Sequence, residues 1–114
     1  MNLPRHAILL RIFIGEGDRH HKLPLYEAIV REAHDRGLAG ATVLHGVMGF
    51  GKSSHIHSAG ILRLSEGLPV VVEIVDTQEN IQSFLPDLDK MIGDGLVTLE
   101  NVEVAVYREK GESA

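Results

Sequence analysis

Residues 69–75 read PVVVEIV, and this β-branched run decides the fold because it is typical of a central strand. Apolar residues recur after it at helical spacing and predict a helix. Asp76 or Thr77 caps that helix, and Asp76 stands at capping-box spacing from Glu79. Pro86 should kink the helix or mark its effective beginning. The apolar stripe consists of Ile81, Phe84, Leu85, Leu88 and Met91 or Ile92.

The first half of the chain has the same order of strand, helix and strand. His6–Ile14 predicts a strand by its alternation, and Gly15–Lys22 predicts a polar loop. Pro24–Arg36 predicts a helix, with Pro24 at the first helical position and Gly37 just past the end. Ala41–His45 predicts a second strand. One face of the first strand consists of Ile8, Leu10, Ile12 and Ile14, and the other carries Arg11 and Phe13.

The remaining segments complete a βαββαβ order. Residues 46–59 show no clear period and predict a long loop, and residues 61–64 have strand character. Leu96–Tyr107 predicts the last strand, or two short strands bent near Glu100 and Asn101. We therefore expect an α+β, ferredoxin-like sandwich, with an antiparallel sheet and two helices on one face. Residues 1–114 form one domain in this prediction, and self-association would cover the open sheet.

Composition narrows the class of function. The chain has 114 residues, a net charge of −5 and no cysteine. The negative net charge argues against nonspecific electrostatic binding to nucleic acid, and the absence of cysteine excludes thiolate metal sites. The chain has three Phe, two Tyr and no Trp, which are too few aromatic side chains to form a surface on which nucleic-acid bases stack. No apolar run reaches the roughly 18 residues that a membrane span needs. These features predict a cytoplasmic protein without a nucleic-acid partner.

Two glycine-rich turns are the candidate ligand-binding elements. They are Gly49-Phe50-Gly51-Lys52 and Gly93-Asp94-Gly95, and the second ends the second helix. Glycine permits positive φ and close approach, so backbone N–H groups there could hold a phosphate. The same turns could be an ordinary hairpin and a helix C-cap. The negative end of a helix opposes an anion, so basic side chains would have to supply the attraction.

Histidines and acids offer weaker signals. His55 and His57 share a face on a strand, and His45 could join them as ligands of zinc, copper or nickel. No set of nucleophile, base and orienting residue is visible, which predicts a non-enzymatic protein. Arg11 interrupts an apolar strand, and we expect it to pair with a carboxylate such as Glu73.

Several segments together resemble PII-type signalling proteins. Residues 40–43 (GATV) with 49–51 (GFG) resemble the end of the PII second strand and the start of its T-loop. Residues 92–95 (IGDG) resemble the B-loop, and 102–103 with 108–112 resemble the last strand and basic C-loop. Residues 11–16, 24–29, 49–51 and 65–70 are similar to a family of short, uncharacterised PII-like prokaryotic proteins. This second likeness covers nearly the whole chain.

The resemblance implies a homotrimer that binds AMP, ADP or ATP in clefts between subunits and signals through a loop. The signalling loop consists of residues 46–59, and its partner would be a transporter or an enzyme. Residues 108–114 are expected to form a mobile tail. The implied nucleotide-binding residues are Thr42, Gly49, Phe50, Gly51, Lys52, Gly93, Asp94, Gly95, Arg108 and Lys110.

The chain departs from the PII pattern in ways that affect the ligand. Leu96 follows Gly95 where PII proteins have a lysine, so triphosphate binding should be weaker unless Lys52 compensates. The loop has no tyrosine, so uridylylation there is not available. The alternative interpretation is a metal-binding trimer that resembles divalent-cation-tolerance proteins, with His45, His55 and His57 as ligands.

Overall fold

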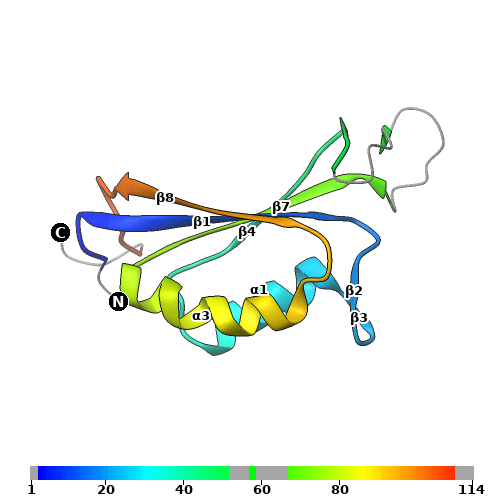
Figure 1. Ribbon diagram of the computed structural model, residues 1–114. Helices are drawn as coiled ribbons and strands as arrows, with labels where there is room; N and C mark the ends of the chain where they lie inside the picture. The colour runs from blue at the N-terminus through cyan, green and yellow to red at the C-terminus, as the bar shows by residue number, and fades with distance from the viewer. Residues whose placement is uncertain (1–2, 52–56, 59–66, 110–114) are drawn as a thin grey trace.

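The computed structural model describes residues 3–51, 57–58 and 67–109. Its main sheet has the antiparallel strand order β4-β7-β1-β8 (Figure 1). The PVVVEIV run lies in β7, an interior strand as predicted. The strands are β1 (His6–Gly15), β4 (Thr42–His45), β7 (Pro69–Asp76) and β8 (Leu96–Glu103).

Both described helices, α1 (Leu25–Asp35) and α3 (Gln78–Met91), cover one face of the sheet (Figure 1). This arrangement confirms the ferredoxin-like α+β prediction. Between the helices and the sheet lies a core in which the predicted face of β1 is buried. No helix among the described residues is long and apolar enough to cross a membrane. The core consists of Leu10, Ile12, Ile14, Leu25, Ile29, Ala33, Val70, Val72, Ile74, Ile81, Phe84 and Leu88.

The helix boundaries correct one sequence prediction and decide between the alternatives left open in two others. Pro24 is the N-cap of α1 with an extended ψ of 139°, not its first helical residue, because it still pairs with Arg19 in a hairpin. Thr77 is the N-cap of α3 and accepts from the Asn80 N–H at 3.0 Å, so the predicted Asp76 box does not form. Pro86 lies inside α3 and does not mark its beginning. The prediction for Gly37 is confirmed by its φ of +74°.

Two segments predicted as loops contain short hairpins. β2 (Arg19–His20) pairs with β3 (Leu23–Pro24), and β5 (Met48–Gly49) pairs with β6 (His57–Ser58). Strands of two residues are too short to produce a visible alternation, which is why the sequence pattern missed them. The predicted strand-like run at 61–64 lies outside the described residues.

The last strand is shorter than predicted and is not broken. β8 continues through Glu100 and Asn101 and ends at Glu103, which pairs with His6, the first residue of β1. Beyond that point β1 offers no partner. The chain therefore leaves the sheet before Tyr107, although the alternation of valines continues to Val106.

The sheet has two ends that differ in what surrounds them. We call the loop end the one where β1 and β4 finish and β7 and β8 begin, at Gly15, His45, Pro69 and Leu96. The terminal end is the opposite one, near His6, Asp76 and Glu103. Figure 1 shows both chain termini at the terminal end and the β2–β3 and β5–β6 hairpins at the loop end.

Candidate functional site

Both glycine turns lie at the loop end of the sheet, where three glycines serve packing within the chain. A Cβ on Gly46 or Gly49 would lie 2.6 or 3.0 Å from Cγ of Pro69. A Cβ on Gly95 would lie 2.9 Å from the carbonyl oxygen of Phe13. Among described glycines only Gly37 has a positive φ, so neither turn uses the left-handed conformation.

Two other glycines have no such internal reason. Within the part of the chain that the structure describes, a Cβ added to Gly51 or to Gly93 would meet nothing within 4 Å, and neither residue has a positive φ. The fold of a single chain therefore leaves these two positions open. They are where a ligand or a second chain could approach the backbone closely.

The Gly93 turn borders an apolar and acidic groove of about 330 Å³ between α3 and β8. Asp94 in the turn is exposed, and α3 ends beside it with its negative pole. Leu96, where PII proteins have a lysine, is 57% exposed. The last turn of α3 carries Lys90, which lines a separate hollow between α1 and α3 and not this groove. The groove is lined by Leu85, Leu88, Asp89, Ile92, Gly93, Gly95 and Val97.

Other predicted site residues lie away from the loop end. Thr42 is exposed on β4 and pairs with Glu73 near the middle of the sheet. Arg108 follows β8 beyond the terminal end, and it makes no ion pair within the described part of the chain. The eight residues of β8 put about 25 Å between the Gly93 turn and the terminal end. Lys52 and Lys110 lie outside the described residues.

The predicted site residues are thus divided within one chain. Gly49, Phe50, Gly51 and the turn of residues 93–95 lie at the loop end, beyond the edge strands β4 and β8, which two interior strands hold about 14 Å apart. Thr42 lies near the middle of the sheet, and Arg108 lies beyond its other end. No single surface of one chain brings both groups together.

The structure adds Glu16, which directly follows β1 and is not among the predicted site residues. Its carboxylate contacts Nε2 of His45, while its backbone N–H donates to the Leu68 carbonyl at 2.8 Å. Tyr26 packs edge-on against His45, with ring centroids 5.4 Å apart. Glu16 therefore touches both the residue before the 46–59 loop and the segment that returns from it. Only the assumed strand order could have suggested that these residues meet.

The metal alternative gains no ligand set from the described residues. Among them, no group of three His, Cys, Asp or Glu side chains is placed to hold an ion. His55 lies outside these residues, and His57 is placed by its backbone pairing with Gly49. The prediction therefore rests on the sequence alone.

The open face of the sheet carries the predicted ion pair. Arg11 Nε donates to Glu73 at 2.8 Å, and Arg11 Nη1 lies 3.8 Å from Glu100. Arg11 and Glu73 form one row across the sheet with Thr42 and Thr98, and Glu100 lies two residues further along β8 toward the terminal end. The next row toward the loop end is apolar, with exposed Leu44 and Leu96 on the two edge strands.

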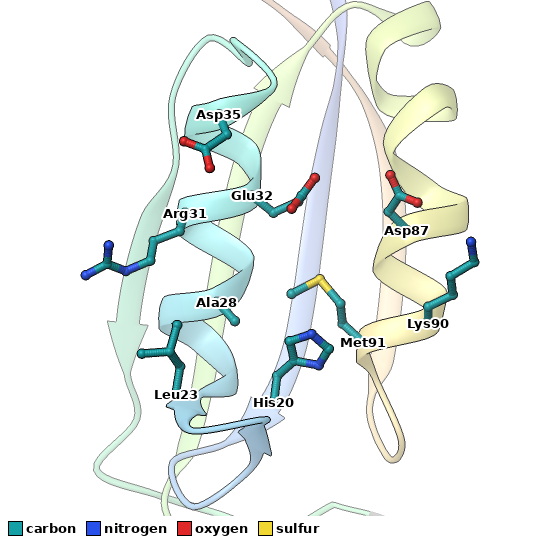
Figure 2. Close-up of a pocket in the computed structure, with 9 residues that line it drawn as sticks. All are labelled: His20, Leu23, Ala28, Arg31, Glu32, Asp35, Asp87, Lys90 and Met91. Atoms are coloured by element: carbon teal, nitrogen blue, oxygen red, sulfur yellow. The ribbon is translucent and has the colours of Figure 1, made fainter.

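A second hollow, of about 530 Å³, lies between α1 and α3 and contains none of the predicted site residues. Figure 2 shows Glu32, Asp87 and Met91 directed into the space between the helices, with His20 at its lower end. Arg36 pairs with both Glu32 and Asp87, so one guanidinium bridges the two acids. This hollow is a helix–helix contact held by charge pairing.

Comparison with solved structures identifies the class of fold as PII-like. A nitrogen regulatory PII-like protein, CPII from Thiomonas intermedia K12, bound to ADP, AMP and bicarbonate, superimposes with a TM-score of 0.60. It is 15% identical, covering 89% of this chain and 90% of that one. A PII-like signalling protein from Thermus thermophilus gives a TM-score of 0.61 at 20% identity, covering 87% and 89%. At these identities the likeness establishes the fold alone.

Sequence comparison gives the family. Residues 7–104 match the DUF190 family, described as "Uncharacterized ACR, COG1993", and the chain belongs to it. A UPF0166 protein of Aquifex aeolicus is 44% identical over 96 residues, covering 84% of this chain and 90% of that protein. A UPF0166 protein of Methanocaldococcus jannaschii is 36% identical over 99 residues, covering 86% and 91%.

Proposed function

We propose that this protein is a PII-like regulator that binds an adenine nucleotide, or a similar anion, between the subunits of a homotrimer. Its loop of residues 46–59 would then signal to a protein partner such as a transporter or an enzyme. The proposal assigns no catalytic residue. It rests first on the division of the candidate site between the two ends of the sheet.

The division favours a site that two chains build together. The loop end offers open backbone at Gly93, where Asp94 and the α3 terminus oppose an anion. The region beyond the terminal end offers Arg108, which has no ion-pair partner within the described residues. A phosphate needs both a close backbone and a cation. In a ring of copies, the loop end of one chain can face the terminal end of the next.

The glycines and the fold support a nucleotide as the ligand. Gly51 and Gly93 are open toward solvent in one chain, as a close approach by phosphate would require. The CPII structure with a similar fold contains ADP, AMP and bicarbonate. Since Leu96 replaces the usual lysine, we expect AMP or ADP to bind more tightly than ATP.

The base of the loop is suited to a protein partner. Val47, Met48 and Phe50 are 77%, 60% and 67% exposed, although all three are large and apolar. Adjacent exposed apolar side chains are typical of interaction surfaces. They adjoin Gly51, so a ligand at that glycine could change how they are presented.

Calorimetric titration with AMP, ADP and ATP, with and without magnesium, tests the ligand. We expect saturable binding of about one nucleotide per chain, as in a symmetric ring with one cleft per subunit. Light scattering on a gel-filtration column should give a trimer. Absence of binding by all three nucleotides, or a monomer in solution, would contradict the proposal.

Mixing two variants tests whether the site lies between chains. Gly93→Val blocks the loop end without an internal clash, and Arg108→Gln removes the cation from the other end. Each variant alone should bind poorly. After unfolding and refolding together, about a quarter of the interfaces join an intact loop end to an intact Arg108 and should bind again. Failure of the mixture to regain binding would place the site within one chain.

A further inference from the structure

The chain beyond β8 is folded back across the terminal end by a short series of contacts. Arg5 Nε donates to Glu103 at 3.1 Å, and the Val104 N–H donates to the Arg5 carbonyl at 2.6 Å. Tyr107 then donates its hydroxyl to the Ala39 carbonyl at 2.9 Å, which joins positions 68 residues apart in the sequence. Arg5 and Glu103 are both largely exposed, so their pairing alone fixes the segment weakly.

The backbone that Tyr107 contacts is itself firmly held. The N–H of Ala39 donates to Asp76 Oδ2 at 2.7 Å. Asp76 is fully buried, and its Oδ1 accepts from the Thr77 N–H at 2.6 Å and from Asn80 Nδ2 at 2.9 Å. Tyr107 is therefore attached, through the single residue Ala39, to the buried carboxylate beside the start of α3.

This attachment determines where the next residue lies. Arg108 follows Tyr107 directly, and Thr42 begins β4 three residues after Ala39. The hydroxyl contact therefore brings the two predicted site residues of this region to the same part of the molecule. Before Tyr107, the segment is held by the contacts of Arg5 with Glu103 and Val104.

We infer that Tyr107 is a positioning residue, whose hydroxyl holds Arg108 where an anion between two chains can reach it. The binding of an anion by Arg108 rests on the proposed function. The positioning of residues 105–108 by the Tyr107 hydroxyl does not. The Tyr107 ring is 42% exposed and could instead stack on a ligand, but the inferred role belongs to the hydroxyl.

The test uses Tyr107→Phe in the full chain, because this change removes the hydroxyl and keeps the ring. Amide ¹⁵N relaxation of residues 105–108 should show order parameters falling from about 0.85 to below 0.6. The affinity for AMP or ADP should fall by about three- to tenfold, the size of one lost hydrogen bond. Tyr26→Phe is the matched control, since the Tyr26 hydroxyl makes no hydrogen bond within the described residues.

A second variant separates positioning from a direct contact with the ligand. In an Arg108→Gln background, Tyr107→Phe should lower the affinity no further, because the guanidinium through which Tyr107 acts is absent. An equal further loss in that background would overturn the positioning role, as would unchanged affinity in Tyr107→Phe alone.

The two proposals fail in different ways. Unchanged order parameters in Tyr107→Phe would overturn the inference whether or not a nucleotide binds. If the wild-type chain binds no nucleotide, the proposed function fails, and the positioning of an anion-binding Arg108 fails with it. Reduced order with reduced affinity, abolished by Arg108→Gln, supports both.

Discussion

The two ends of the sheet are held by different kinds of contact. At the loop end, Gly46 and Gly49 lie against Pro69, and Gly95 lies against the Phe13 carbonyl. The terminal end is held instead by the buried Asp76 carboxylate, which accepts three hydrogen bonds. The packing of the loop end therefore depends on glycines, which have no side chain. The terminal end depends on the polar side chain of Asp76.

This difference matters for the site. At the loop end, the backbone of Gly51 and Gly93 is open to close approach. The polar network at the terminal end fixes the backbone to which Tyr107 and Arg108 are attached. A ring that joins unlike ends would combine exposed backbone with a positioned cation, which neither end provides alone.

The largest expected effect comes from removing the carboxylate of the terminal end. Asp76→Ala leaves the N–H groups of Ala39 and Thr77 without their acceptor in a buried place. We expect the free energy of unfolding to fall by about 3 to 5 kcal/mol, measured by urea denaturation. Asp94→Ala at the loop end, where the side chain is exposed, should change it by less than about 0.5 kcal/mol. Equal effects of the two changes would contradict the comparison.

A smaller effect should distinguish two glycines in one turn. Gly95→Ala places a Cβ 2.9 Å from the Phe13 carbonyl oxygen and should cost about 1 to 3 kcal/mol. Gly93→Ala meets nothing within 4 Å and should leave the unfolding free energy unchanged or raise it by up to about 1 kcal/mol. Thermal unfolding of both variants measures the difference. If Gly93→Ala were the more damaging, the open-backbone assignment of Gly93 would be wrong.

The sequence predicted those parts of the fold that repeat at short range. Alternation placed Ile8, Leu10, Ile12 and Ile14 on one face, and the β-branched run placed β7 inside the sheet. The pairing of Arg11 with Glu73 also followed, because an arginine on an apolar strand needs a nearby acid.

Features that depend on distant residues were not predictable in this way. Asp76 and Thr77 are both good N-caps, and the choice between them depends on the Ala39 N–H, which lies 37 residues away. The valine alternation after Glu103 gives no information on where the partner strand begins.

The site shows the same limit. The glycine turns could be identified from the sequence. The sequence did not indicate which of their glycines the fold itself requires. Gly95 is used by the Phe13 carbonyl, whereas Gly93 is not. The separation of Arg108 from the Gly93 turn likewise follows from the length and direction of β8.

The smallest expected effect concerns the side-chain contact between Glu16 and His45 at the loop end, which is an ion pair only when His45 is protonated. A double-mutant cycle with Glu16→Gln and His45→Gln should give a coupling of about 0.2 to 1 kcal/mol, because His45 is 46% exposed and solvent screens the pair. The coupling should shrink further in 1 M salt, where the Debye length is about 3 Å. A coupling above about 2 kcal/mol would show that a charged side chain also holds the loop end, and the contrast with Asp76 would then disappear.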